Sequence, residues 1–99
     1  METLNSIKPV LLSKEQLNQL TYTAQDVLSD DALKAERLHK LQKAMILGNS
    51  EDHVKVTIIF KSREGFFRVE TTVWAVGDTT IQLKANVFIP IGAILDVVF

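Results

Sequence analysis

Histidine is the side chain best suited to moving protons near neutral pH, and the chain has two, His39 and His53. His53 follows Asp52, whereas His39 stands between Leu38 and Lys40. Nucleophilic catalysis needs a base beside an activated side chain, and no segment resembles a nucleophile elbow. The chain has no cysteine, which excludes thiolate catalysis, thiolate metal sites and disulfides. We therefore interpret both histidines as exposed or capping residues and expect no enzyme.

Carboxylates that could bind a cation gather in two short segments of the chain. The first group is Asp26, Asp30 and Asp31, and the second is Glu51, Asp52 and His53. Neither spacing matches an EF-hand loop, and the first group suits the start of a helix, where carboxylates accept hydrogen bonds from free N–H groups. The glycines stand singly, at 48, 65, 77 and 92, so no phosphate-cradling loop is present. We predict no metal site and no cofactor.

The charge pattern gives limited support to nucleic-acid binding. The net charge is −1, divided into −2 before His53 and +1 after it, without the positive excess of most nucleic-acid binders. A positive stripe could combine Lys34, Arg37, Lys40 and Lys43 with Lys55, Lys61, Arg63 and Arg68. Candidate stacking aromatics are Phe66, Phe67 and Trp74. Because Glu36, Glu64 and Glu70 interrupt the stripe, we favour a solvated, salt-bridged face and keep RNA binding as the alternative.

The elements that must position these residues are helical in the first half of the chain. We expect residues 1–12 to form an irregular or extended lead-in that docks through Ile7, Val10, Leu11 and Leu12. Ser13 and Gln16 match a capping box for a first helix. Its apolar stripe would be Leu17, Leu20, Ala24 and Val27 or Leu28. The β-prone Thr21-Tyr22-Thr23 leaves open whether this helix is short or broken.

A second helix is predicted from about Asp31 to Leu47, after the capping residues Ser29-Asp30-Asp31. Its buried edge would be Leu38, Leu41 and Met45, with Ala32, Ala35 and Ala44 as close-packing positions. Gly48-Asn49 would end it with a left-handed residue.

After Glu51-Asp52 the apolar period changes from 3.6 to 2, which predicts strands. The first strand would bury Val54, Val56, Ile58 and Phe60 and turn at 62–65. The next, Phe66 to Val76, has conflicting alternation that a bulge or bend near Thr72–Ala75 would resolve. Further strands are expected at 79–84, with Ile81 and Leu83 inward, at 87–90 and at 94–99, joined by a turn at Ala85-Asn86 and a corner at Pro90–Gly92.

These elements predict one α+β domain, mainly helical over 1–50 and β over 53–99. Five consecutive strands with tight turns favour antiparallel pairing. We expect the helical segment to pack on a small, bent, five-stranded barrel, because closure removes exposed strand edges.

The tail Asn86-Val87-Phe88-Ile89-Pro90-Ile91-Gly92-Ala93-Ile94-Leu95-Asp96-Val97 resembles the closing phrase of SH3-like and Sm-like small barrels. The segments Val69–Val76 and Gln82–Lys84 also resemble a stretch shared by small uncharacterised bacterial proteins, to which no activity attaches. Gly77-Asp78-Thr79-Thr80 has the Asp but lacks the Asn of the Sm RNA site. Sm proteins carry a second RNA signature, Arg-Gly or Lys-His, before the last strand, where this chain has Ile89-Pro90-Ile91-Gly92. No family site residue therefore carries over.

The β half has more apolar residues than one small barrel can bury. Trp74 is out of phase with Val69, Thr71 and Val73, so it either fills the core after a bulge or anchors an interface on the opposite face. Ile59, Phe66, Phe88 and Val98 are also out of phase. We predict a self-associating, non-enzymatic interaction module, with Trp74, Phe88, Val98 and Phe66 as candidate interface residues.

The expected location is cytoplasmic. No apolar run reaches the roughly 20 residues of a membrane span, and an acid follows Met1 where a signal peptide carries basic residues. We therefore predict no membrane partner.

Overall fold

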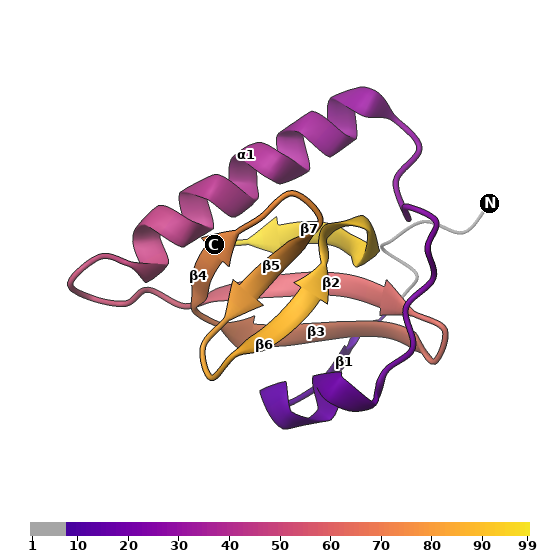
Figure 1. Ribbon diagram of the computed structural model, residues 1–99, viewed down its shortest axis with the longest axis horizontal. Coiled ribbons are helices and arrows are strands. Elements are labelled where there is room, and N and C mark those ends of the chain that lie inside the picture. Colours follow the sequence, from indigo (N-terminus) through magenta and orange to yellow (C-terminus); the bar gives the residue numbers. More distant parts are fainter. Residues whose placement is uncertain (1–7) are drawn as a thin grey trace.

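The computed structural model describes residues 8–99 (Figure 1). The elements are β1 (Val10–Leu11), η2 (Lys14–Gln19), α1 (Asp31–Gly48), β2 (Val56–Ser62), β3 (Gly65–Thr71), β4 (Val73–Val76), β5 (Thr80–Leu83), β6 (Val87–Pro90), η3 (Ile91–Ala93) and β7 (Ile94–Val98). The protein is thus α+β, with one α-helix over this range and strands in two sheets. Among the described residues, no helix combines the length and apolar character needed to cross a membrane.

Helix α1 confirms the predicted second helix. The Asp30 side chain caps it by accepting hydrogen bonds from the N–H groups of Ala32 and Leu33, at 2.7 and 3.3 Å. Its buried row is Arg37, Leu41, Ala44 and Gly48. Of the expected edge, Leu41 is confirmed as buried and Met45 packs half-buried against the core, whereas Leu38 is wrong, since it is 41 % exposed. Of the three alanines expected at close-packing positions, Ala44 alone is buried.

Gly48 allows the end of α1 to pack closely against the chain at Thr72 and Val73, and it does not end the helix as predicted. The predicted left-handed exit is not formed, because Asn49 has φ −92° and Gly48 belongs to the helix. A Cβ atom on Gly48 would overlap the carbonyl oxygen of Val73 and lie 2.9 Å from Cγ2 of Thr72. The missing side chain thus lets the end of α1 rest directly on the chain where β4 begins.

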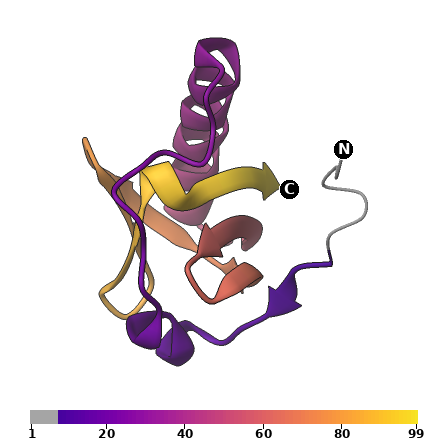
Figure 2. The ribbon, with the colours of Figure 1, turned by 90° about the vertical axis from the view of Figure 1, so that its right-hand side faces the viewer.

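The first predicted helix is short. The capping box of Ser13 and Gln16 is confirmed, with the Ser13 N–H donating to Oε1 of Gln16 at 2.9 Å, but only the 3-10 helix η2 follows it. Leu17 is buried. Residues 20–30 instead run across the end of the sheets to α1 (Figure 2). Backbone bonds hold this segment: Arg63 N–H donates to the Thr21 carbonyl and Val27 N–H to the Gly92 carbonyl, both at 2.8 Å.

Sheet A has the strand order β1-β3-β2-β7. The predicted hairpin joins β2 to β3, with Ser62 opposite Gly65 and Gly65 at φ 143°. The lead-in supplies an element that the sequence did not predict, because Val10 and Leu11 form β1 in parallel with β3. Both residues remain about half exposed, and Leu12 packs against the core. The expected docking of Ile7 lies outside the described residues.

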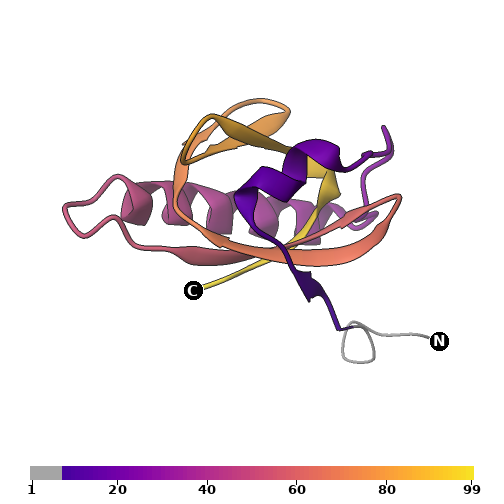
Figure 3. The same cartoon turned by 90° about the horizontal axis from the view of Figure 1, so that it is seen from below.

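The predicted bend is confirmed at Thr72, where the chain leaves β3 of sheet A and enters β4 of sheet B (Figure 3). Sheet B has the order β4-β5-β6, and its register shifts between Val73 and Ala75. On the inner side Val69, Thr71 and Val73 are all buried. One continuous run of chain therefore belongs to two sheets.

The expected closed five-stranded barrel is wrong, since the strands form two sheets that are not joined into a ring. Helix α1 packs against β4 and β7, an edge strand of each sheet, and η2 packs against β6 on the opposite side (Figure 1). The helices thus occupy the places where further strand pairing would close the ring. Apolar side chains from both sheets and both helices meet between them, including Leu17, Leu41, Ile58, Phe60, Ile81, Leu83, Ile89 and Ile94.

We predict that Gly48→Ala destabilises the fold by roughly 1–3 kcal/mol, the usual cost of overfilling a packed site. The added Cβ must displace the Val73 carbonyl, although alanine is the better helix former. Urea denaturation gives the free energy of unfolding. Gly92→Ala is the matched control, since its Cβ would meet Asp26 at ordinary contact distances of 3.6 Å or more. Equal stability losses in the two variants would contradict the close approach.

Candidate functional site

The four predicted interface residues lie on two different sheets and do not form one patch. Trp74 and Phe88 belong to β4 and β6 of sheet B and are 44 % and 51 % exposed. Phe66 and Val98 belong to β3 and β7 of sheet A. Val98 is exposed, whereas Phe66 is half-buried.

The outer face of sheet B carries a row of three side chains, Trp74, Gln82 and Phe88. Ile81 opposite Ile89 and Leu83 opposite Val87 are buried pairs that point inward. Gln82 opposite Phe88 alternates with these pairs and points outward. Gln82 is also opposite Ala75, the residue after Trp74. We call this row of Trp74, Gln82 and Phe88 the aromatic row.

Trp74 takes the second of the two orientations that the sequence left open. The register shift follows Val73, which is fully buried, so Trp74 stays on the outer face instead of entering the core. Its carbonyl accepts a hydrogen bond of 3.0 Å from Nδ2 of Asn49, at the end of α1. A hollow of about 130 Å³ lies beside its side chain and is lined by His53, Thr72, Trp74 and Lys84.

Phe66 and Val98 lie among charged residues on the outer face of sheet A. The Lys61 ammonium is 5.3 Å from the centre of the Phe66 ring. The same face carries Arg68 and Glu70 along β3, two and four residues beyond Phe66. Lys43 similarly covers the ring of the terminal Phe99 at 4.8 Å. These contacts give the apolar groups of sheet A charged neighbours.

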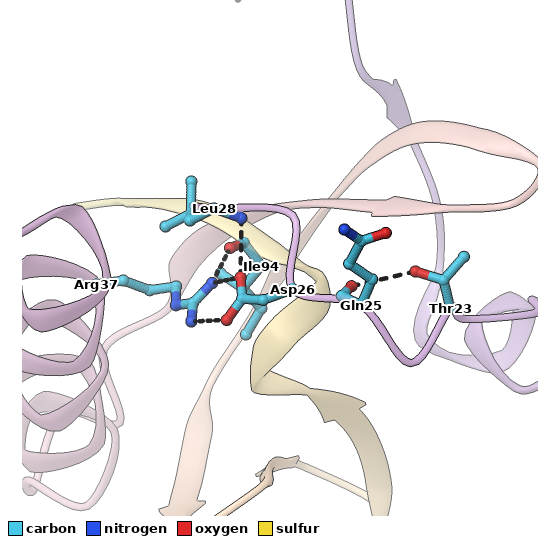
Figure 4. A network of polar contacts seen from close by, with 6 residues as sticks. All are labelled: Thr23, Gln25, Asp26, Leu28, Arg37 and Ile94. Carbon is cyan, nitrogen blue, oxygen red and sulfur yellow. Dashed lines mark hydrogen bonds and ion pairs between the residues drawn. The ribbon is translucent and has the colours of Figure 1, made fainter. Parts of the chain in front are cut away.

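The strongest polar cluster joins α1 to residues 20–30 and β7 (Figure 4). Arg37 donates to both carboxylate oxygens of Asp26, at 2.9 and 2.7 Å, and to the carbonyl of Ile94 at 3.0 Å. Asp26 also accepts the N–H of Leu28 at 2.8 Å. The hydrogen bonds from Arg37 hold the pKa of the Asp26 carboxyl below its ordinary value. The cluster fixes the loop before α1 on the helix and on the last strand.

Sequence reasoning missed this pair, because it placed Arg37 in an exposed positive stripe and Asp26 in an acidic group near the helix start. Arg37 is only 6 % exposed. A signal existed: Arg37 lies four and seven residues before Leu41 and Ala44, so it shares their inward row. A buried guanidinium needs a carboxylate partner, but the sequence does not say which acid supplies it.

A second cation of the helix is also paired with carboxylates. Lys40 lies 2.8 Å from Oδ1 of Asp96 and 3.6 Å from Oε1 of Glu36, and the hydrogen bond to Asp96 is the main cause that raises its pKa. The salt-bridged face that the sequence favoured is therefore present at Lys40, where it interrupts the alternative stripe of free positive charge.

Arg37 lines two grooves of similar size, besides a smaller hollow of about 210 Å³ next to Leu95 and Asp96. One, of about 430 Å³, lies between α1 and the β4–β5 turn, with Leu38, Val76 and Asp78 among its lining residues. The other, of about 420 Å³, lies between residues 23–26 and η3. Arg37 lines both grooves, but its positive charge is already paired with the Asp26 carboxylate. We therefore interpret the pair as one that holds the loop in place.

The histidines do not face a hydroxyl in a catalytic arrangement. His39 is exposed on α1, and Nδ1 of His53 lies 3.2 Å from the Gly48 carbonyl oxygen. Across residues 8–99, no three His, Asp or Glu side chains gather in a way that could hold a metal ion.

Comparisons with known proteins found no match, whether among family models, curated proteins or solved structures.

We predict that Asp26→Ala costs about 3 kcal/mol of stability, because it leaves the buried Arg37 without its counter-ion. Arg37→Met should cost less, since it keeps an apolar stem and leaves Asp26, whose side chain is 27 % exposed, free to be hydrated. Urea denaturation of both variants at neutral pH compares the two losses. A larger loss of stability for Arg37→Met than for Asp26→Ala would contradict the predicted order of the two variants.

The same pair predicts a pH dependence. Folding lowers the pKa of Asp26 below its ordinary 3.8, so the pair stabilises the fold fully above that pH and progressively less as the pH falls through the folded pKa. The stability advantage of the wild type over Asp26→Asn should therefore be largest near neutral pH and shrink in acid. Denaturation curves at neutral and strongly acidic pH measure it, and an advantage independent of pH would refute the linkage.

Proposed function

We propose that the protein is an intracellular, non-enzymatic interaction module that associates with a second copy of itself through the outer face of sheet B. The observation that carries the proposal is the aromatic row, in which two large exposed aromatic side chains flank an uncharged glutamine. Aromatic anchors of this kind are enriched at the centres of protein interfaces.

The covered edges of the sheets favour association through a face. An open strand edge is a template for pairing with another chain. Here α1 lies against the edge strands β4 and β7, η2 lies against β6, and β1 has only two residues. The last strand, which carries the expected interface residue Val98, is therefore a poor template for strand addition, whereas Trp74 and Phe88 are exposed on the outer face of sheet B.

The area of this face determines how tightly two copies are expected to bind each other. Sheet B has three strands of four residues, which at about 4.8 Å between strands and 3.3 Å per residue give a face of roughly 200 Å². A standard stable interface buries about 800 Å² per partner. We therefore expect a weak, concentration-dependent dimer, in which residues around the aromatic row add contact area.

The resemblance to SH3-like and Sm-like small barrels is part of the same proposal. It is supported by the strand bent at Thr72 and by the 3-10 turn η3, which follows Pro90 and leads into the last strand. RNA binding, the alternative drawn from the sequence, has less support, because Arg37 and Lys40 are paired with carboxylates. Titration with labelled RNA at two salt concentrations separates it from self-association.

We predict that Trp74→Ala or Phe88→Ala shifts the monomer–dimer equilibrium toward monomer, raising the dissociation constant about tenfold or more, as truncation of a central aromatic anchor does. Sedimentation equilibrium from micromolar to near-millimolar concentration measures the mass. Val98→Ala is the matched control, because Val98 is similarly exposed but lies on sheet A.

A wild-type chain that stays at 11.1 kDa over this concentration range would refute the proposal. Equal weakening by Val98→Ala and Trp74→Ala would contradict the choice of surface.

A further inference from the structure

We propose that the groove between α1 and the β4–β5 turn binds a small amphipathic carboxylate, such as a medium-chain fatty acid, whose head group pairs with Arg37 and Lys34. This groove, which we call the α1 groove, has a volume of about 430 Å³, within the usual size range of small-molecule sites. It shares no residue with the aromatic row, so a ligand here would bind whether or not the chain self-associates.

Arg37 has hydrogen-bond donors that the fold does not use. A guanidinium carries five N–H groups in one plane, two on each Nη and one on Nε. Nη1 donates to Oδ1 of Asp26 and to the carbonyl of Ile94, and Nη2 donates to Oδ2 of Asp26 (Figure 4). Nε is buried and has no partner among the described residues. Two parallel donors therefore remain, the Nε–H and the second Nη2–H, on the edge of the guanidinium that Asp26 does not occupy.

This free edge of Arg37 is suited to a carboxylate. Two parallel N–H groups in one plane match the two oxygens of a carboxylate group. The Arg37 side chain is only 5 % exposed, and a buried donor without an acceptor costs free energy. Because Arg37 itself lines the α1 groove, a ligand lying in the groove can supply the missing acceptor.

Lys34 adds positive charge at the same place. It lies three residues before Arg37, about one helical turn away, and lines the α1 groove with it. Its ammonium forms no salt bridge with another of residues 8–99. Besides the hydrogen bond from Arg37, the charge of Lys34 is among the causes that lower the pKa of Asp26, which places the ammonium near the Arg37–Asp26 pair. An anionic head group would therefore meet an unpaired cation beside the free edge of Arg37.

The apolar part of the α1 groove accounts for a leucine that the sequence placed in the core. Lys34, Leu38 and Gln42 recur every four residues, so they form one row on α1, about 12 Å long at 1.5 Å per residue. Leu38 is 41 % exposed and shares the groove with Val76 and Ile91. These side chains suit a hydrocarbon tail, which favours an amphipathic acid over an inorganic anion.

Two features of the α1 groove limit the affinity. Nε of Arg37 is buried, so a ligand must displace lining side chains to reach it. Leu38 and Gln42 are exposed, and Leu38 lies outside the core cluster, so both can change rotamer without loss of core packing. The exposed Asp78 lines the same groove, and its charge opposes an incoming carboxylate.

Titration with octanoate, below its micelle-forming concentration, tests the site. In nitrogen–proton correlation spectra we expect the Nε–H signal of Arg37 to shift, together with the backbone amides of residues 76–78. Octanamide is the matched control ligand, because it has the same tail without the charge. It should bind at least about tenfold more weakly, since hydrogen bonds to charged groups contribute more than those between neutral groups.

Variants on the rim of the α1 groove give an independent readout. Lys34→Gln should weaken octanoate binding about two- to fivefold, the range for an exposed ion pair, and Asp78→Asn should strengthen it by a similar factor. Leu38→Glu should weaken it about tenfold or more, because it places a like charge beside the head group. Lys43→Gln is the control and should leave binding unchanged, since Lys43 lies on the same helix but contacts Phe99.

Urea denaturation checks that each variant remains folded. Equal binding of octanoate and octanamide, or an Arg37 Nε–H signal that octanoate does not shift, would overturn the proposed site. Equal effects of Lys34→Gln and Lys43→Gln would overturn it as well, because the two variants change the charge of the helix alike and differ only in their distance from the groove.

Discussion

The structure depends on the bend at Thr72, where one run of chain passes from sheet A to sheet B. Thr72 and Val73 are buried there, and the end of α1 rests on Val73 because Gly48 has no side chain. The bend gives each sheet one face toward the shared core and one face outward. It also directs Trp74 away from the core, so a constraint on the backbone determines which aromatic residue reaches the surface.

Two helices hold the sheets together where strand pairing stops. Helix α1 spans the edges formed by β4 and β7, and the Arg37–Asp26 pair ties its first half to the loop that leads into it. On the opposite side η2 contributes the buried Leu17 beside β6. Covering the edges in this way protects the sheets from strand addition and leaves their outer faces as the exposed surfaces.

Much of the fold follows from local pattern in the sequence. The period-2 alternation of Val56, Ile58 and Phe60 and the capping residue Asp30 identified β2 and α1 nearly to the residue. The conflict of phase around Trp74 identified the bend. What local pattern could not supply was long-range pairing: β1 joins β3 across more than fifty residues, and Asp26 was one of several acids available to Arg37. The candidate site was half predicted, since Trp74 and Phe88 share a face whereas Phe66 and Val98 lie on the other sheet.

The central claim is that the outer face of sheet B is the surface through which the chain associates with itself. Nitrogen–proton correlation spectra, recorded from low micromolar to near-millimolar protein concentration, test it most directly. We expect concentration-dependent shifts of the Trp74 indole N–H and of the Gln82 and Phe88 amides, with little change at Glu70 on sheet A. Spectra that do not change with concentration, or shifts confined to sheet A and α1, would contradict the account.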